Sequence, residues 1–224
     1  FGSRWRRRFP DMTAAVERDS IRTEPADLVA GNVYDKYHTA NPIARHLMSG
    51  FLGAFDRLLQ LDEGERLLEV GCGEGYLMRR ISDSFPSAHR AGCDLSFEIV
   101  AGASRQGCPQ VPFLQASVYQ LPWPDQSWDV VVACEVLEHL DEPEQALREM
   151  NRVCRRGCLV SVPREPLWSL ANLGRLRYLG RLGNTPGHVQ RWSSARFTEL
   201  VGRYFRVEQV LQPFPWTMIW STKK

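Results

Sequence analysis

Three glycines at alternate positions are the first residues of this chain whose spacing indicates chemistry. Gly71, Gly73 and Gly75 belong to the run E-V-G-C-G-E-G at residues 69–75, between an apolar segment and a segment with helical periodicity. Glycine at such a turn permits positive φ angles and lets a ligand approach where a Cβ would clash. The free N–H groups at the start of the following helix face the same ligand. The turn therefore predicts a binding site for a nucleotide-like cofactor.

The spacing also separates the candidate cofactors. The dinucleotide fingerprint G-x-G-x-x-G requires a glycine where this chain has Tyr76, one residue after Gly75, and the phosphate-loop pattern requires a lysine that does not follow. Asp94 ends the next apolar segment, where a carboxylate can accept both hydroxyl groups of a ribose. A carboxylate there would repel the 2′-phosphate of NADP. Because Tyr76 stands where the dinucleotide fingerprint requires glycine, an NAD-type oxidoreductase is the disfavoured alternative.

The run E-x-G-x-G-x-G resembles motif I of the class I S-adenosylmethionine-dependent methyltransferases, in particular their type 11, ubiquinone-biosynthesis-like branch that acts on small molecules. The resemblance extends over about residues 60–210. It implies S-adenosylmethionine as the cofactor, S-adenosylhomocysteine as the product, and a Rossmann-like fold. By resemblance, Glu69 supports the loop and the amino-acid end of the cofactor, Leu95 packs on the adenine or ribose, and backbone near Cys134 holds the amino end.

The third expected strand departs from the family pattern. Many relatives carry an aspartate at the position of Ser117, where it accepts a hydrogen bond from the adenine amino group. A serine hydroxyl can accept the same bond without the assistance of a charge, and the N–H of Val118 can serve a ring nitrogen. The cofactor-binding residues expected from the pattern and the resemblance are Glu69, Gly71, Cys72, Gly73, Gly75, Asp94, Leu95, Ser117, Val118, Cys134 and Tyr37.

The segment C-E-V-L-E-H-L at residues 134–140 follows the expected fourth strand and resembles the same branch of the family. The end of this strand is where the methyl group would face the acceptor, so Cys134 and Glu135 should line the site. His139 could assist deprotonation of an acceptor, or it could be a structural histidine that bonds to nearby backbone. Both interpretations stay open.

Residues 164–191 interrupt the alternation of strands and helices and should select the substrate. Five arginines and several aromatic residues lie in this insert, with Glu165 as its one acidic residue. An apolar cover rich in arginine indicates an anionic or lipid-like acceptor, although a solvated face of a structural insert explains the composition as well. His188 is the preferred candidate base. The expected acceptor-site residues are Glu135, His139, Trp168, Tyr178, His188 and Trp192.

The periodicity of the chain predicts the elements that must position these residues. Strands are expected at 66–70, 89–93, 111–115, 128–134, 157–162, 205–211 and 216–221, and helices near 75–84, 96–105, 143–153 and 194–203. This alternation predicts a doubly wound α/β domain, Rossmann-like, with a seven-stranded and mostly parallel sheet covered on both faces. Asp141 and Ser193 are the expected caps of the last two helices.

An N-terminal helical extension should precede the first strand. Asn41-Pro42 is typical of a helix start, and apolar residues then recur at helical spacing up to Leu59. Tyr37 lies just upstream, where related architectures close a tyrosine-bearing segment over the cofactor or substrate; a surface aromatic residue is the equal alternative. The expected organisation is a polar tail (1–30) and one domain (31–224), which includes a helical cap (31–60) and the insert (164–191).

Composition limits the partners. The 224 residues carry a formal net charge of +2, and the motif that marks methylation of DNA bases is absent, so DNA is not an expected partner. The six cysteines mostly lie in apolar runs, which indicates a reducing compartment, and no segment resembles a membrane span, so we expect a cytoplasmic protein. Cys154 and Cys158 lack a second pair, so no metal site is expected.

These observations together predict methyl transfer to a small molecule, at oxygen, by in-line displacement. Two alternatives stay open. One is a non-catalytic module that binds the cofactor or serves as a scaffold. The other is a tRNA or protein methyltransferase, because arginines surround Trp5 in a basic N-terminal arm that could contact RNA. The sequence leaves the acceptor unnamed and does not distinguish a monomer from a homodimer.

Overall fold

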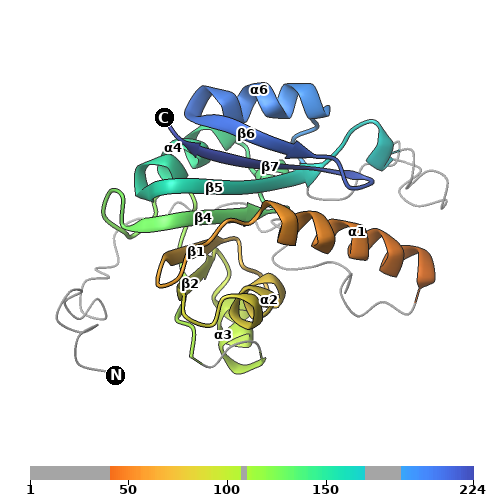
Figure 1. Ribbon diagram of the computed structural model, residues 1–224. Helices are drawn as coiled ribbons and strands as arrows, with labels where there is room; N and C mark the ends of the chain where they lie inside the picture. The colour runs from red at the N-terminus through yellow and green to blue at the C-terminus, as the bar shows by residue number, and fades with distance from the viewer. Residues whose placement is uncertain (1–40, 107–109, 170–187) are drawn as a thin grey trace.

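The computed structural model describes residues 41–106, 110–169 and 188–224. Within them the chain forms a seven-stranded sheet in the order β3-β2-β1-β4-β5-β7-β6, in which β7 runs antiparallel to both of its neighbours and the other pairs are parallel (Figure 1). This confirms the predicted Rossmann-like α/β architecture. The elements are α1 (Pro42–Leu58), β1 (Arg66–Val70), α2 (Tyr76–Ser84), β2 (His89–Asp94), α3 (Phe97–Gln106), β3 (Phe113–Gln115), β4 (Trp128–Cys134), the 3-10 turn η2 (Leu137–His139), α4 (Pro143–Val153), β5 (Cys154–Pro163), α6 (Ser194–Tyr204), β6 (Phe205–Leu211) and β7 (Trp216–Lys223).

Two hydrophobic cores lie on the two faces of this sheet. Successive strand residues point to opposite faces, so Leu67 packs with α1 and α2, whereas Leu68 packs with α4 and α6. Strands β1 and β4 are buried on both faces, which explains why they appear in the sequence as continuous apolar runs. Figure 1 shows α4 and α6 together on one side of the sheet.

Helix α1 begins as the sequence predicts. The Asn41 side chain accepts hydrogen bonds from the N–H groups of Ile43 and Ala44, at 2.9 and 3.3 Å. Its buried face includes Phe51 and Phe55, and Phe51 meets Trp216 of β7 edge to face, with ring centroids 5.1 Å apart. Full burial of such a side chain stabilises the fold by about 1.5–3 kcal/mol, so α1 is a packed part of the domain.

One of the two other predicted caps is correct. The Ser193 hydroxyl accepts a hydrogen bond from the N–H of Arg196 at the start of α6. The prediction for Asp141 is wrong, because α4 has Glu142 at its N-cap position and makes no capping bond from that side chain. Pro143 occupies the first helical position, where its missing N–H costs nothing, and this places Asp141 one residue outside the cap.

The cysteines behave as small apolar residues. Cys72, Cys93 and Cys158 are buried and unoxidised, and burial raises the pKa of each thiol. Among the described helices, none is both long and apolar enough to cross a membrane. The polar tail, Tyr37 and Tyr178 lie outside the described residues, as does most of the insert, so the predicted domain boundaries remain expectations.

Candidate active site

The glycine turn joins β1 to α2 at the carboxyl ends of the parallel strands. Gly71, Gly73 and Gly75 all have positive φ angles, of 66°, 52° and 80°. A Cβ on Gly71 would come within 2.4 Å of a methyl group of Val136, so this glycine is required by packing. A Cβ on Gly73 would meet no atom of the described residues within 4 Å. The backbone at Gly73 therefore faces open space, as the approach of a ligand requires.

Asp94 holds this turn. Its Oδ2 accepts a hydrogen bond from the N–H of Gly73 at 3.0 Å, and its Oδ1 accepts one from the N–H of Ser96 at 3.2 Å. An ionised carboxylate offers about four lone-pair sites, so acceptor capacity remains for hydroxyl groups. The carboxylate thus lies directly beside the open space at Gly73.

The ends of β2 and β3 are tied together next to Asp94. The N–H of Ala116 donates to the carbonyl of Asp94 at 2.9 Å, and the amide of Gln115 donates to the carbonyl of Leu95 at 3.0 Å. The Leu95 side chain is 48% exposed, which leaves an apolar face for a planar ring. The hydroxyl of Ser117 accepts a hydrogen bond from the N–H of Tyr119 at 3.3 Å and keeps its own proton to donate.

Glu69 is the unusual carboxylate of the site. It lies on β1 and is 3% exposed; burial, and then the negative charge of Asp94, raise the pKa of its carboxyl group to about 8. Its Oε2 has no hydrogen-bond partner within the described part of the chain. Because a buried polar atom without a partner is costly, this oxygen suits a positively charged ligand group such as an ammonium.

The acceptor half is assembled from two segments distant in sequence. The N–H groups of Val189 and Gln190 donate to the main-chain carbonyl of Glu138, at 2.9 and 3.0 Å. These bonds place His188 beside His139, with ring centroids 4.9 Å apart. The two histidines that the sequence nominates as candidate bases are thus brought together.

An aromatic wall continues from this histidine pair. The ring of Trp168 stacks on His188 at 6.0 Å, and the ring of Trp216 lies 5.7 Å from Trp168. The indole N–H of Trp216 donates to Oε2 of Glu135 at 2.7 Å. Glu135 has a φ of 61°, a left-handed conformation that is rare for this residue type and is often found at functional sites.

A family model described as a methyltransferase domain matches residues 68–162, from β1 to β5. Over these residues the chain is similar to S-adenosylmethionine-dependent methyltransferases. The residues described above are compatible with the cofactor S-adenosylmethionine, because Gly73 faces space that the described residues leave open, the Asp94 carboxylate lies beside it, and one Glu69 oxygen has no partner among the described residues.

Relatives of the chain extend this similarity. It is 37% identical over 164 residues to a protein of Mycolicibacterium smegmatis named as a probable S-adenosylmethionine-dependent methyltransferase, which covers 71% of this chain and 59% of that protein. It is 29% identical over 123 residues to a malonyl-[acyl-carrier protein] O-methyltransferase of Bacillus anthracis. This match covers 54% of this chain and 44% of that protein. The chain spans about half the length of these relatives.

The fold matches solved methyltransferases as well. The magnesium protoporphyrin IX methyltransferase of Synechocystis PCC 6803, with bound S-adenosylhomocysteine, superimposes with a TM-score of 0.59 and 18% identity, covering 83% of this chain and 89% of that one. At this identity the likeness concerns the fold alone.

The packing of Trp192 differs from that of Trp168. The ring of Trp192 packs at 5.6 Å against Phe197 of α6, in the core with α4 and α6, whereas Trp168 packs in the core with α1 and α2. The main chain of Trp192 forms an isolated bridge with Arg164, directly after β5. The role of Trp192 in the acceptor site stays a prediction.

Two residues near the site were missed from the sequence. Phe97 opens α3 and is 63% exposed, close along the chain to the exposed Leu95. Its exposure carries no sequence signal, since an apolar residue at a helix start normally packs inward. Trp216 appeared only as a strand residue, because its contact with Glu135 joins positions far apart in the chain.

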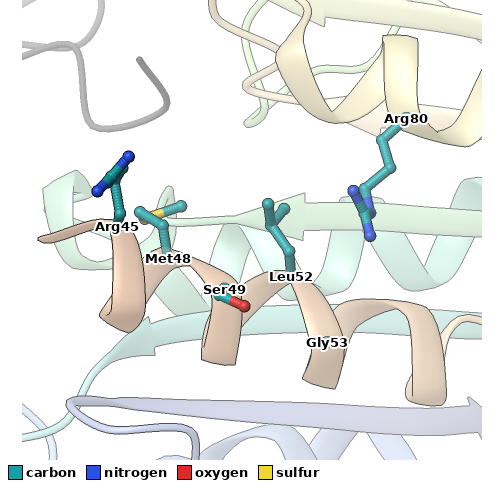
Figure 2. Close-up of a pocket in the computed structure, with 6 residues that line it drawn as sticks. All are labelled: Arg45, Met48, Ser49, Leu52, Gly53 and Arg80. Atoms are coloured by element: carbon teal, nitrogen blue, oxygen red, sulfur yellow. The ribbon is translucent and has the colours of Figure 1, made fainter. Parts of the chain in front are cut away.

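A cavity of about 360 Å³ lies between α1 and α2 (Figure 2). It is lined by Arg45, Met48, Ser49, Leu52, Gly53 and Arg80. Figure 2 shows Arg80 on α2 opposite the α1 residues, and its guanidinium is paired with Asp56. Within the described part of the chain, none of the predicted site residues lines this cavity.

Proposed function

We propose that this chain transfers a methyl group from S-adenosylmethionine to an oxygen atom of a small-molecule acceptor. The observation that carries the proposal is the pairing of two half-sites: the open turn at Gly73 with Asp94, and the His139–His188 pair with its aromatic wall. The malonyl-[acyl-carrier protein] O-methyltransferase among the relatives supports oxygen as the acceptor atom and an acyl group as the part that is methylated.

Each residue of the cofactor half has a proposed task. Asp94 accepts hydrogen bonds from the ribose hydroxyls, and Glu69 meets the amino group of the methionine part. Leu95 packs on the adenine ring, and Ser117 with the N–H of Val118 bonds to its edge. Cys72, Gly75 and Cys134 contribute backbone around the cofactor.

Positioning supplies most of the rate. Bound S-adenosylmethionine carries an activated methyl group, because its sulfonium sulfur leaves as a neutral thioether. The protein's main task is then to align the acceptor oxygen with the methyl carbon and the sulfur, which can contribute about 7–11 kcal/mol. A base that removes the acceptor's proton adds about 10²–10⁴-fold.

The histidine pair is the proposed proton acceptor. His188 lies between Trp168 and His139, so it can contact an acceptor that rests on the aromatic wall. Glu135 and Trp216 form the next part of this wall. Aromatic rings together with the arginines of the insert favour an anionic or lipid-like acceptor, and Tyr178 remains a candidate contact.

The proposed base is tested by the variant His188→Ala. We expect it to lower turnover by about 10²–10⁴-fold and to leave the affinity for S-adenosylhomocysteine unchanged. The assay measures transfer of a labelled methyl group to malonyl thioesters, phenols and fatty acids. His89→Ala is the control, since His89 is exposed on β2. Full turnover by His188→Ala would exclude it as the base.

Two other functions are outcomes of the same assay. Cofactor binding without transfer to any acceptor would indicate a non-catalytic module, and salt-dependent RNA binding with transfer to RNA would indicate a tRNA methyltransferase. The free, buried cysteines support a reducing compartment, so we place the protein in the cytoplasm as part of this proposal. A gel-filtration mass would distinguish a monomer from a homodimer.

A further inference from the structure

A cluster of three potential metal ligands lies beside the aromatic wall. Its members are Glu138, His139 and His188, and one ligand atom from each lies within 4.8 Å of the other two. We propose that this cluster binds one divalent first-row transition-metal ion, with zinc as the best match. The proposal departs from the sequence expectation of no metal, which considered only the cysteines.

The fold, rather than local sequence, assembles this cluster. Glu138 and His139 are neighbours on the 3-10 turn η2, whereas His188 comes from a segment almost fifty residues later in the chain. The carbonyl of Glu138 accepts hydrogen bonds from the N–H groups of Val189 and Gln190. The main chain of Glu138 thus fixes the two residues that follow His188. A site held in this way is ordered before an ion arrives.

The distances suit a metal after a small adjustment. Ligand atoms that are 2.0–2.1 Å from one zinc ion stand about 3.3 Å apart in a tetrahedral site. Since the ligand atoms lie within 4.8 Å of one another, the side chains need to close by at most about 1.5 Å, a shift within reach of χ rotations. The two imidazole rings are already close and nearly perpendicular, at 77°.

Burial favours the same interpretation. Glu138 is 2% exposed, and both histidines are half-buried. A buried carboxylate is stable when it is paired or coordinates a metal. All three side chains make other contacts in the structure, so the ion would replace part of these. The ring of Trp168 stacked on His188 provides the apolar surroundings that control access of solvent to a metal.

The ligand types indicate the class of ion. Two imidazole nitrogens and one carboxylate oxygen form the ligand set of catalytic zinc sites, which keep a fourth position open. Magnesium and calcium prefer all-oxygen ligands and do not match. The open position would lie next to the aromatic wall. If the proposed function holds, the ion would replace His188 as the group that promotes loss of the acceptor's proton. Ligation occupies a ring nitrogen of His188, and a metal lowers the pKa of a coordinated hydroxyl oxygen.

The site is tested by direct binding of the metal alone. The full chain is treated with EDTA, dialysed and titrated with ZnCl₂ in a calorimeter, and the visible spectrum is recorded with CoCl₂. We expect one ion per chain. His139→Ala, His188→Ala and the isosteric Glu138→Gln should each weaken zinc binding by at least about 10-fold, since even loss of an outer partner costs 10–100-fold. His89→Ala should bind zinc as the unmodified chain does, because His89 is exposed on β2 and is not part of the cluster.

Two results would overturn the metal site. One is the absence of stoichiometric zinc binding, and the other is equal affinity in all three ligand variants, which would assign the ion to surface groups or thiols. Because the titration contains neither cofactor nor acceptor, its outcome is separate from that of the proposed function. Zinc binding without methyl transfer would support the metal site and contradict the proposed function. Methyl transfer that resists EDTA, in a chain that binds no zinc, would support the proposed function and contradict the metal site.

Discussion

At the scale of single residues, two carboxylates define the cofactor half and differ in their surroundings. Asp94 accepts backbone N–H groups with both oxygens, whereas Glu69 is buried beside that negative charge and has an oxygen without a partner among the described residues. Asp94 therefore serves both the turn and the proposed ribose contact. Glu69 is destabilising to the folded chain when it is ionised and no ligand is present.

We expect Asp94→Asn to weaken binding of S-adenosylhomocysteine by about 10- to 100-fold, because hydrogen bonds to a charged group contribute about 1.5–3 kcal/mol. The measurement is isothermal titration calorimetry. Asp83→Asn, on the exposed side of α2, is the control. Equal affinities of Asp94→Asn and the unmodified chain would remove the ribose role from Asp94.

The raised pKa of Glu69 predicts a pH-dependent stability. A carboxyl whose folded pKa is about 8 and whose ordinary value is 4.5 favours folding when protonated. The ligand-free chain should therefore lose stability relative to Glu69→Gln as the pH rises from about 4.5 to about 8, by an amount on the order of a few kcal/mol at most. Urea unfolding at pH 5, 7 and 9 measures this difference. Parallel stability profiles of the two proteins would show that Glu69 ionises normally.

At the scale of elements, local patterns predicted most of what the structure contains. The strand and helix ranges follow the apolar periodicity, and the caps at Asn41 and Ser193 follow residue type. Asp141 failed as a cap because the following proline decided where the helix starts. Strand β3 starts at Phe113, two residues later than expected, after Pro112, which has no N–H to donate to a ladder.

Two glycines of the turn between β1 and α2 should have different roles, Gly71 in folding and Gly73 in cofactor binding. We expect Gly71→Ala to lower the free energy of unfolding by about 1–3 kcal/mol, since its Cβ overlaps Val136. Gly73→Ala meets open space, so it should cost only the strain of a positive φ, on the order of 1 kcal/mol, while cofactor affinity falls. Thermal melting with and without S-adenosylhomocysteine measures both effects. Normal cofactor binding by Gly73→Ala would contradict the assignment of the open space.

At the scale of the whole molecule, the residues proposed for the site follow the carboxyl ends of the parallel strands β1, β2 and β4. The cofactor half was predictable because its residues follow strand ends in a fixed order along the chain. The acceptor half was only partly predictable, because contacts such as Trp216 with Glu135 join distant segments and leave no local pattern. The same limit applies to Trp192, because its contact with Phe197 could not be predicted from the sequence, and its role in the acceptor site stays a prediction.

The identity of the cofactor is the central claim, and thermal melting of the purified chain tests it most directly. The chain is melted alone and with S-adenosylmethionine, S-adenosylhomocysteine, NAD or NADP. A ligand at about 100 times its dissociation constant adds roughly 2.7 kcal/mol, which for a chain of this size raises the melting temperature by about 5–10 °C. We predict this rise with the two adenosyl compounds and none with the dinucleotides. A rise in melting temperature with NAD, or no rise with any of the four compounds, would contradict the account.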